Sequence, residues 1–384
     1  MKPRDRAALL ALAPYLCCIF AQGATGQSGS QALELARSAE ASQSKGDLKA
    51  AIEGFRRALA QEPTLIEAQV GLGSALIAGG ELDEAIAVET RALQGSPDNA
   101  ALRTNLGLAY YRKGDLASAR RQLEKVRASH PDDVKAAVLL GFTFNKLDRE
   151  ANTVALLAPL EKEHSSDLDL EYALGYALMM TGQREEGLDR VEKVAAARHA
   201  ADIWMLAGSA HFELGEFKQA LADAQQAIAA NGSFAGAHTL AGKAFYARRM
   251  LDEAAREFQT ALSQNPTDFT ANLYLGIIRF DDKDLESARP LLELALSIHP
   301  EDPLTRLEVA RLRNLEGNLQ EALAMLEALV QSDPDWPDPH VHLAALYYKM
   351  HRPEDGRRER EIVKKLQEIQ HKRGQGEGSV TPGP

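Results

Sequence analysis

Prolines recur every 34 residues in two parts of this chain, and this spacing constrains the fold more than any other feature. They stand at Pro63, Pro97 and Pro131, and again at Pro266, Pro300 and Pro334. A fixed period of this length indicates an array of repeated structural units, because one such unit cannot bury its apolar face alone.

Small residues recur with the same period. One series comprises Ala39, Gly73, Gly107, Gly141, Gly175, Gly208, Gly242, Gly276, Ala310 and Ala344, with a single step of 33 between Gly175 and Gly208. Alanines follow twelve residues later in most units, at Ala51, Ala85, Ala119, Ala220, Ala254, Ala288 and Ala322. Glycine inside a helix costs about 1 kcal/mol relative to alanine, so its recurrence predicts that a second helix approaches closely. We expect that second helix to place its own alanine at the contact.

Each unit is therefore predicted to contain two helices. In residues 100–114, Leu102, Leu106 and Tyr110 share one helical face. Gly114 is suited to the left-handed residue that ends a helix, and Asp115 is suited to cap the next one. Ala, Leu, Glu and Gln recur throughout the chain, which favours helix further.

The pattern resembles the tetratricopeptide repeat over roughly residues 32–372. This resemblance implies an all-α fold, an α-solenoid of about ten stacked helix-turn-helix repeats in a right-handed superhelix with a concave groove. The expected organisation is a signal peptide at 1–23, a flexible linker at 24–31, repeats at 32–65, 66–99, 100–133, 134–167, 168–200, 201–234, 235–268, 269–302, 303–336 and 337–372, the last including a capping helix, and a disordered tail at 373–384.

The fourth and fifth repeats depart from the family pattern. Thr153 and Gly187 replace its first alanine, and the family's tryptophan survives only as Trp204. Pro159 lies inside a predicted helix, where proline costs about 3 kcal/mol and should kink or break the helix. We therefore expect an irregularity between about residues 150 and 200.

The N-terminal segment has the pattern of an export signal. Lys2, Arg4 and Arg6 precede an apolar run from Ala7 to Ala21, and cleavage is expected after Gly23. An exported protein, periplasmic or secreted and of bacterial type, is the main interpretation. A lipidated Cys17 or Cys18 and an uncleaved membrane tether are the alternatives. The net charge of −11 makes nucleic acid a poor partner.

No catalytic, metal or cofactor motif emerges from the sequence. The ten histidines form no metal-binding set, and His340 and His342 are two residues apart, facing different ways on a helix. The mature chain contains no cysteine, and there is no phosphate-binding loop after a strand. We expect no cofactor and no enzymatic activity.

Family geometry directs certain side chains of each first helix toward the concave groove. The resulting candidates for partner contact are Asn105, Tyr111, Arg112, Phe142, Asn145, Lys146, Tyr176, Met179, Phe212, Lys243, Tyr246 and Phe280. Aromatic and methionine side chains give large contact area at modest entropic cost, although they could equally pack between repeats. The lysines of the family's carboxylate clamp are missing.

The resulting functional hypothesis is a scaffold that binds a protein or peptide, in a cell-envelope or secretion assembly. Three alternatives remain: a carbohydrate-binding adaptor of polysaccharide machinery, a membrane-tethered adaptor that keeps its N-terminus, and an enzyme hidden within residues 150–200.

Overall fold

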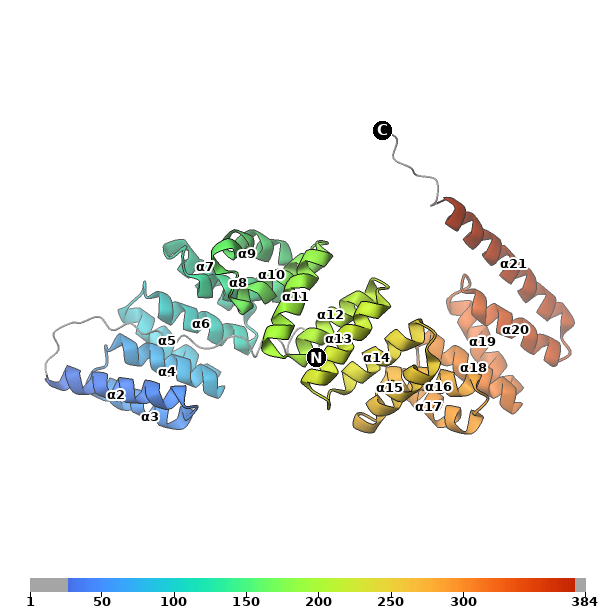
Figure 1. Cartoon of the computed structure of the whole chain (residues 1–384), viewed down its shortest axis with the longest axis horizontal. Helices are drawn as coiled ribbons and strands as arrows, with labels where there is room; N and C mark the ends of the chain where they lie inside the picture. Colours follow the sequence, from blue (N-terminus) through green and yellow to red (C-terminus); the bar gives the residue numbers. More distant parts are fainter. Residues whose placement is uncertain (1–26, 377–384) are drawn as a thin grey trace, which may run out of the picture. The chain divides into compact units, whose positions relative to one another are not determined.

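The computed structural model describes residues 27–376, which form twenty α-helices and no strand (Figure 1). The fold is a solenoid of paired helices, so the predicted all-α class is confirmed. Two compact units divide the chain, one up to Ala207 and one from Gly208 onward, and the boundary lies within helix α12 (Ala201–Glu213).

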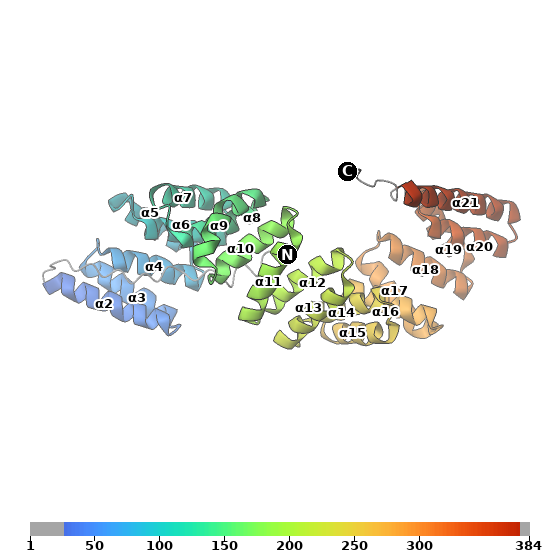
Figure 2. The same cartoon turned by 45° about the horizontal axis from the view of Figure 1, so that its top comes forward.

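Helices follow one another along each unit in chain order (Figure 2). The first unit contains α2 (Gln27–Ser44), α3 (Leu48–Gln61), α4 (Ile66–Gly79), α5 (Leu82–Gly95), α6 (Ala100–Lys113), α7 (Leu116–Ser129), α8 (Val134–Lys146), α9 (Glu150–His164), α10 (Leu168–Met180) and α11 (Arg184–Arg198). The second contains α13 (Phe217–Ala230), α14 (Ala235–Ala247), α15 (Leu251–Gln264), α16 (Phe269–Asp281), α17 (Leu285–Ile298), α18 (Pro303–Glu316), α19 (Leu319–Ser332), α20 (Pro337–Lys349) and α21 (Pro353–Gly376).

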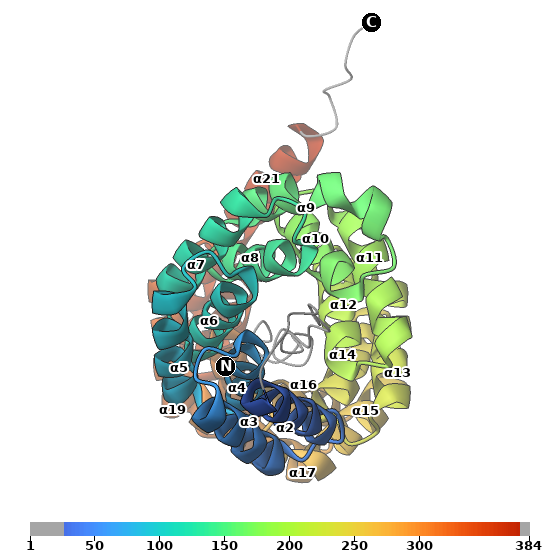
Figure 3. The same cartoon turned by 90° about the vertical axis from the view of Figure 1, so that its left-hand side faces the viewer.

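Two rows of helices run through each unit. Even-numbered helices form the A row and odd-numbered helices the B row, with the A row on the inner side (Figure 3). Neighbouring A-row helices pack directly on each other, as α2, α4 and α6 do. Neighbouring B-row helices do not pack to this extent within the described residues, because each one packs instead between two A-row helices. Closer spacing in the A row makes that side of each unit concave.

Left-handed residues close the turn between the two helices of a repeat. Gly114 has φ +87°, and the side chain of the next residue, Asp115, accepts a hydrogen bond from the Ser118 N–H at 3.0 Å. The same conformation occurs without glycine at Arg249 and Lys283, with φ of 62° and 68°. The predicted glycine and aspartate signals are therefore correct, and the backbone adopts the turn even where glycine is missing.

Mid-helix glycines of the A row allow the close approach that their period indicates. A Cβ at Gly107 would lie 2.8 Å from Leu123 Cγ, and one at Gly242 would lie 2.6 Å from the Phe258 ring. In these two repeats the nearest atoms belong to a large apolar side chain of the B helix. The predicted alanine position also lies at the contact, since a Cβ at Gly208 would lie 3.3 Å from the Ala220 carbonyl oxygen. Ala119 is fully buried but stands one turn earlier in the same helix.

A polar side chain stabilises the turn between successive repeats. Six residues after a repeat-ending proline, a side chain donates a hydrogen bond to that proline's carbonyl: Gln69 to Pro63 at 2.8 Å, Asn272 to Pro266 at 3.0 Å, His340 to Pro334 at 3.0 Å, and Arg103 to Pro97. These donors occupy the position of the family's tryptophan. They satisfy carbonyls that have no backbone partner in the proline turn, and the repeat pattern in the sequence does not reveal this role.

The predicted break at Pro159 does not occur, and a kink there stays a prediction. Helix α9 continues through Pro159, as α17 continues through Pro290. Both prolines are exposed, so water can satisfy the carbonyl that loses its intrahelical partner. Only His199 and Ala200 separate α11 from α12, and His199 is left-handed, with φ 49°.

The C-terminal helix α21 packs on α20. Gly356 approaches the Tyr348 ring, and the Arg360 guanidinium lies 4.9 Å from the centre of the same ring. The helix continues to Gly376, so the first residues of the predicted tail are helical, as are residues 27–31 of the predicted linker. The predicted signal peptide and residues 377–384 lie outside the described residues. Between residues 27 and 376, no helix is both long and apolar enough to cross a membrane.

Candidate functional site

Most of the twelve predicted groove residues lie in the core. Seven are buried, namely Asn105, Tyr111, Phe142, Asn145, Tyr176, Met179 and Phe280. The other five are partly exposed, namely Arg112, Lys146, Phe212, Lys243 and Tyr246. Their role in partner contact stays a prediction, but the buried members can offer a partner little surface.

Several of the predicted aromatic side chains pack between repeats. Tyr111 is only 2% exposed, and the rings of Phe142 and Tyr172, from successive A-row helices, have centroids 6.1 Å apart. Tyr246 and Tyr274 stand similarly at 4.9 Å, edge to face. Such contacts stabilise aromatic pairs by about 0.5–1.5 kcal/mol beyond their buried area. Inter-repeat packing therefore explains their recurrence without a ligand.

Cations from the next repeat cover several of these rings. The Lys146 ammonium lies 4.9 Å from the Tyr111 centroid, Lys243 lies 4.1 Å from Phe212, and the Arg311 guanidinium lies 4.7 Å from Phe280. Partial burial lowers the pKa of Lys243, with Glu213 opposing that effect. The A-row surface therefore presents charged groups above the aromatic rings, rather than the open rings expected from the sequence.

The predicted polar residues hold neighbouring repeats together. Asn105 Nδ2 donates to the Val70 carbonyl at 3.1 Å, Asn145 Nδ2 to the Ala173 carbonyl at 2.9 Å, and Arg112 to the Ile77 carbonyl at 2.9 Å. Each bond joins two A-row helices. Satisfying buried carbonyls is a structural role, and it accounts for these three residues.

Asn105 also donates to Glu89, a buried carboxyl of α5. The distance from Asn105 Nδ2 to Glu89 Oε1 is 2.9 Å, and Glu89 is fully buried beneath Gly73. Burial raises the pKa of Glu89 well above its ordinary value, and the bond from Asn105 opposes this only in part. The equivalent position is Leu123 in the next repeat and Leu292 in a later one.

The first unit contains a pocket of about 850 Å³ on its A-row side. Its lining comes from α2, from the first halves of α4, α6 and α8, from the turns that precede α6 and α8, and from Phe55 of α3 and Ser129 of α7. None of the twelve predicted residues belongs to this lining. The twelve predicted residues lie in the middle and at the end of their helices, whereas α4, α6 and α8 contribute their first halves to the pocket. The proline turns, correctly located by the period, were the available signal.

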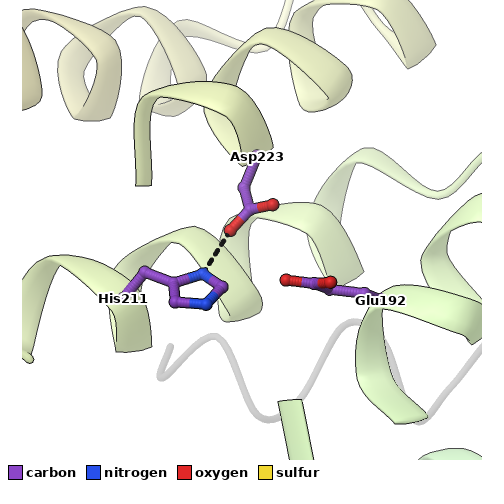
Figure 4. A group of neighbouring side chains, drawn as sticks. All are labelled: Glu192, His211 and Asp223. Carbon is purple, nitrogen blue, oxygen red and sulfur yellow. Dashed lines mark hydrogen bonds and ion pairs between the residues drawn. The ribbon is translucent and has the colours of Figure 1, made fainter. Parts of the chain in front are cut away.

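Three histidine–carboxylate pairs join the two helices of a repeat in the second unit. His211 Nδ1 lies 2.7 Å from Asp223 Oδ2 (Figure 4), His238 Nδ1 lies 2.7 Å from Glu257 Oε2, and His340 Nδ1 lies 2.6 Å from Glu359 Oε2. Burial raises the pKa of Asp223, and the hydrogen bond from His211 opposes this. All three acids occupy the same position in their repeats, which indicates a recurring contact between the two helices of a repeat.

Sequence profiles of one family match successive parts of the chain. Two profiles described as Tetratricopeptide repeat match residues 43–88 and 279–346, and residues 104–151, 172–236 and 239–303. A third, described as TPR repeat, matches residues 73–114. Together they extend over most of both units.

Several solved structures resemble the chain. A tetratricopeptide repeat protein from Parabacteroides merdae is 20% identical, with a TM-score of 0.47, over 66% of this chain and 99% of that one. YrrB, described as a TPR protein with an unusual peptide-binding site, is 22% identical, with a TM-score of 0.40, over 46% and 92%. Yeast Tom70 is 13% identical, with a TM-score of 0.36, over 88% and 93%. No curated protein sequence matches the chain.

Proposed function

Because this chain belongs to the tetratricopeptide-repeat family, a family of protein-interaction scaffolds, we propose that it binds an extended segment of a partner protein on the A-row side of its first unit. It acts by holding that partner, without a chemical step.

The pocket of the first unit is the observation that carries this proposal. Its volume of about 850 Å³ lies within the range of sites that enclose small ligands or several side chains. A-row helices supply most of its lining, and their direct packing holds them together before a partner arrives. A preformed site loses less conformational entropy on binding than a flexible one.

The arrangement of polar groups favours binding over catalysis. A histidine–carboxylate pair contributes to catalysis when it activates a neighbouring nucleophile. The pairs at His238 and His340 instead connect an A helix to its own B helix, and His340 also donates to a turn carbonyl. Both ring nitrogens of His340 are therefore engaged in holding the fold.

Photo-crosslinking tests the proposed surface. We expect benzoylphenylalanine placed at Leu33, Ile66 or Val134, all lining the pocket, to crosslink to a partner protein in cells. The same group at Glu53 or Lys125, exposed on the B row, serves as the control and should give little product. Crosslinks that form only from the B-row positions would show that the partner binds the opposite side.

We further propose that the protein is exported and acts in a cell-envelope or secretion assembly. The support is the basic, then apolar, then small-residue order of residues 1–23. In a bacterial host, N-terminal sequencing of the protein from the periplasm should begin at Ala24. A chain that retains Met1 and stays with the membrane would instead indicate a tether, and one that stays in the cytoplasm would reject export.

A further inference from the structure

The pocket of the first unit has an apolar floor. Leu33 of α2, Phe55 of α3, Ile66 and Val70 of α4, and Val134 of α8 all contribute to its lining. Phe55 and Val70 are buried, whereas Leu33, Ile66 and Val134 remain partly exposed. Aliphatic or aromatic side chains of a ligand would gain free energy by covering these exposed groups.

Acidic side chains surround this floor. Five carboxylates line the pocket, from Glu40, Glu67, Asp98, Asp132 and Asp133. The basic side chains are Arg37 and Lys135, and both already interact with other groups of the chain. Asp98 and Asp132, by contrast, are exposed at the rim. The pocket therefore has an excess of negative charge next to apolar surface, and this charge favours a cationic ligand.

The helix N-termini at the pocket do not change its preference for a cation into one for an anion. The first turns of α6 and α8 would attract an anion if their N–H groups were open. However, the Asn99 side chain accepts from the Leu102 N–H at 3.0 Å, and Asp133 accepts from the Ala136 N–H at 2.9 Å. Each of these two caps satisfies one N–H group of its first turn, and an anionic ligand at the helix N-termini would also meet the five carboxylates.

We propose that this pocket selects a partner segment in which apolar side chains stand next to lysine or arginine. The apolar side chains cover Leu33, Ile66 and Val134, while the cations lie beside Asp98 and Asp132. This inference rests on the proposed function and adds the chemistry of the partner segment to it.

Fluorescence polarisation on the full chain tests the charge preference. The probe is a short labelled peptide in which leucine alternates with lysine, compared with one carrying glutamate at each lysine and one carrying serine at each leucine. We expect only the leucine–lysine peptide to bind. The double variant Asp98→Lys and Asp132→Lys should weaken that binding about tenfold, because it replaces two attractions by two repulsions. Added salt should weaken it as well.

A matched control separates local from overall charge. Glu53→Lys with Asp189→Lys makes the same change in net charge at exposed sites on the B row of the same unit, and should leave the affinity unchanged. Equal loss in both double variants, or binding of the glutamate peptide, overturns the inference. If pocket crosslinking identifies a partner segment that is acidic, this inference fails while the proposed function stands. If no A-row position crosslinks, the proposed function itself fails.

Discussion

Replacing Gly187 with alanine should destabilise the first unit by about 2–3 kcal/mol, although it restores the alanine typical of the family. A Cβ at Gly187 would lie 2.5 Å from the Gly175 carbonyl oxygen and 2.7 Å from the Met179 backbone nitrogen. Backbone atoms cannot rotate away as a side chain can, so α10 and α11 would have to separate. Better helix propensity recovers only about 1 kcal/mol of this cost.

Urea unfolding followed by helical circular dichroism measures the loss, and hydrogen exchange in α10 and α11 locates it. Gly95→Ala is the matched control, because Gly95 ends a B-row helix with no other group within 4 Å of the added Cβ. That variant should be neutral or slightly more stable. If Gly187→Ala behaves like Gly95→Ala, the two helices do not approach as closely as described.

Replacing Glu89 with glutamine should stabilise the protein at pH 7 by about 1–2 kcal/mol, the typical cost of burying a poorly satisfied polar group. Burial raises the pKa of Glu89 in the folded state. The folded protein therefore binds this proton more tightly than the unfolded chain. The associated stabilisation is complete below the ordinary glutamate pKa of about 4.3 and is lost as the pH rises through the folded-state pKa.

The advantage of the glutamine variant should accordingly shrink as the pH falls from about 7 to about 4. Denaturation midpoints of the wild type and the variant, measured in parallel across this range, test it, since other carboxylates titrate equally in both proteins. Glu53→Gln, at an exposed site, should show no such pH-dependent difference. A difference for Glu89→Gln that is constant with pH would mean that Glu89 does not titrate as a buried acid.

The fold class could be predicted from the sequence because periodic small residues and turn signals report local requirements. Gly107 marks a close helix contact and Gly114 a left-handed turn, and each requirement is visible in one repeat and reinforced by the next. The length of α9 could also have been anticipated. Pro159 stands two residues from buried Leu157, on the exposed side of the helix, where a proline is tolerated.

The candidate site was much harder to predict. Whether Tyr111 lines a groove or packs between repeats depends on the angle between successive repeats and on Lys146 of the next repeat, which covers its ring. Neither is visible in the sequence of one repeat. The pocket combines residues as distant as Leu33 and Val134, which only stacking brings together. Glu89 was missed because a lone glutamate in a helix resembles a solvated one until its surroundings are known.

Direct packing along the A row, without equivalent packing along the B row, has a mechanical consequence. When a unit flexes, its helix pairs rotate about the A row, because direct contacts hold the A-row helices together. B-row helices of neighbouring repeats then move apart, while the distances between A-row helices change little. A ligand bound against the A row therefore keeps its contacts during such bending, so one unit can be both elastic and able to bind tightly.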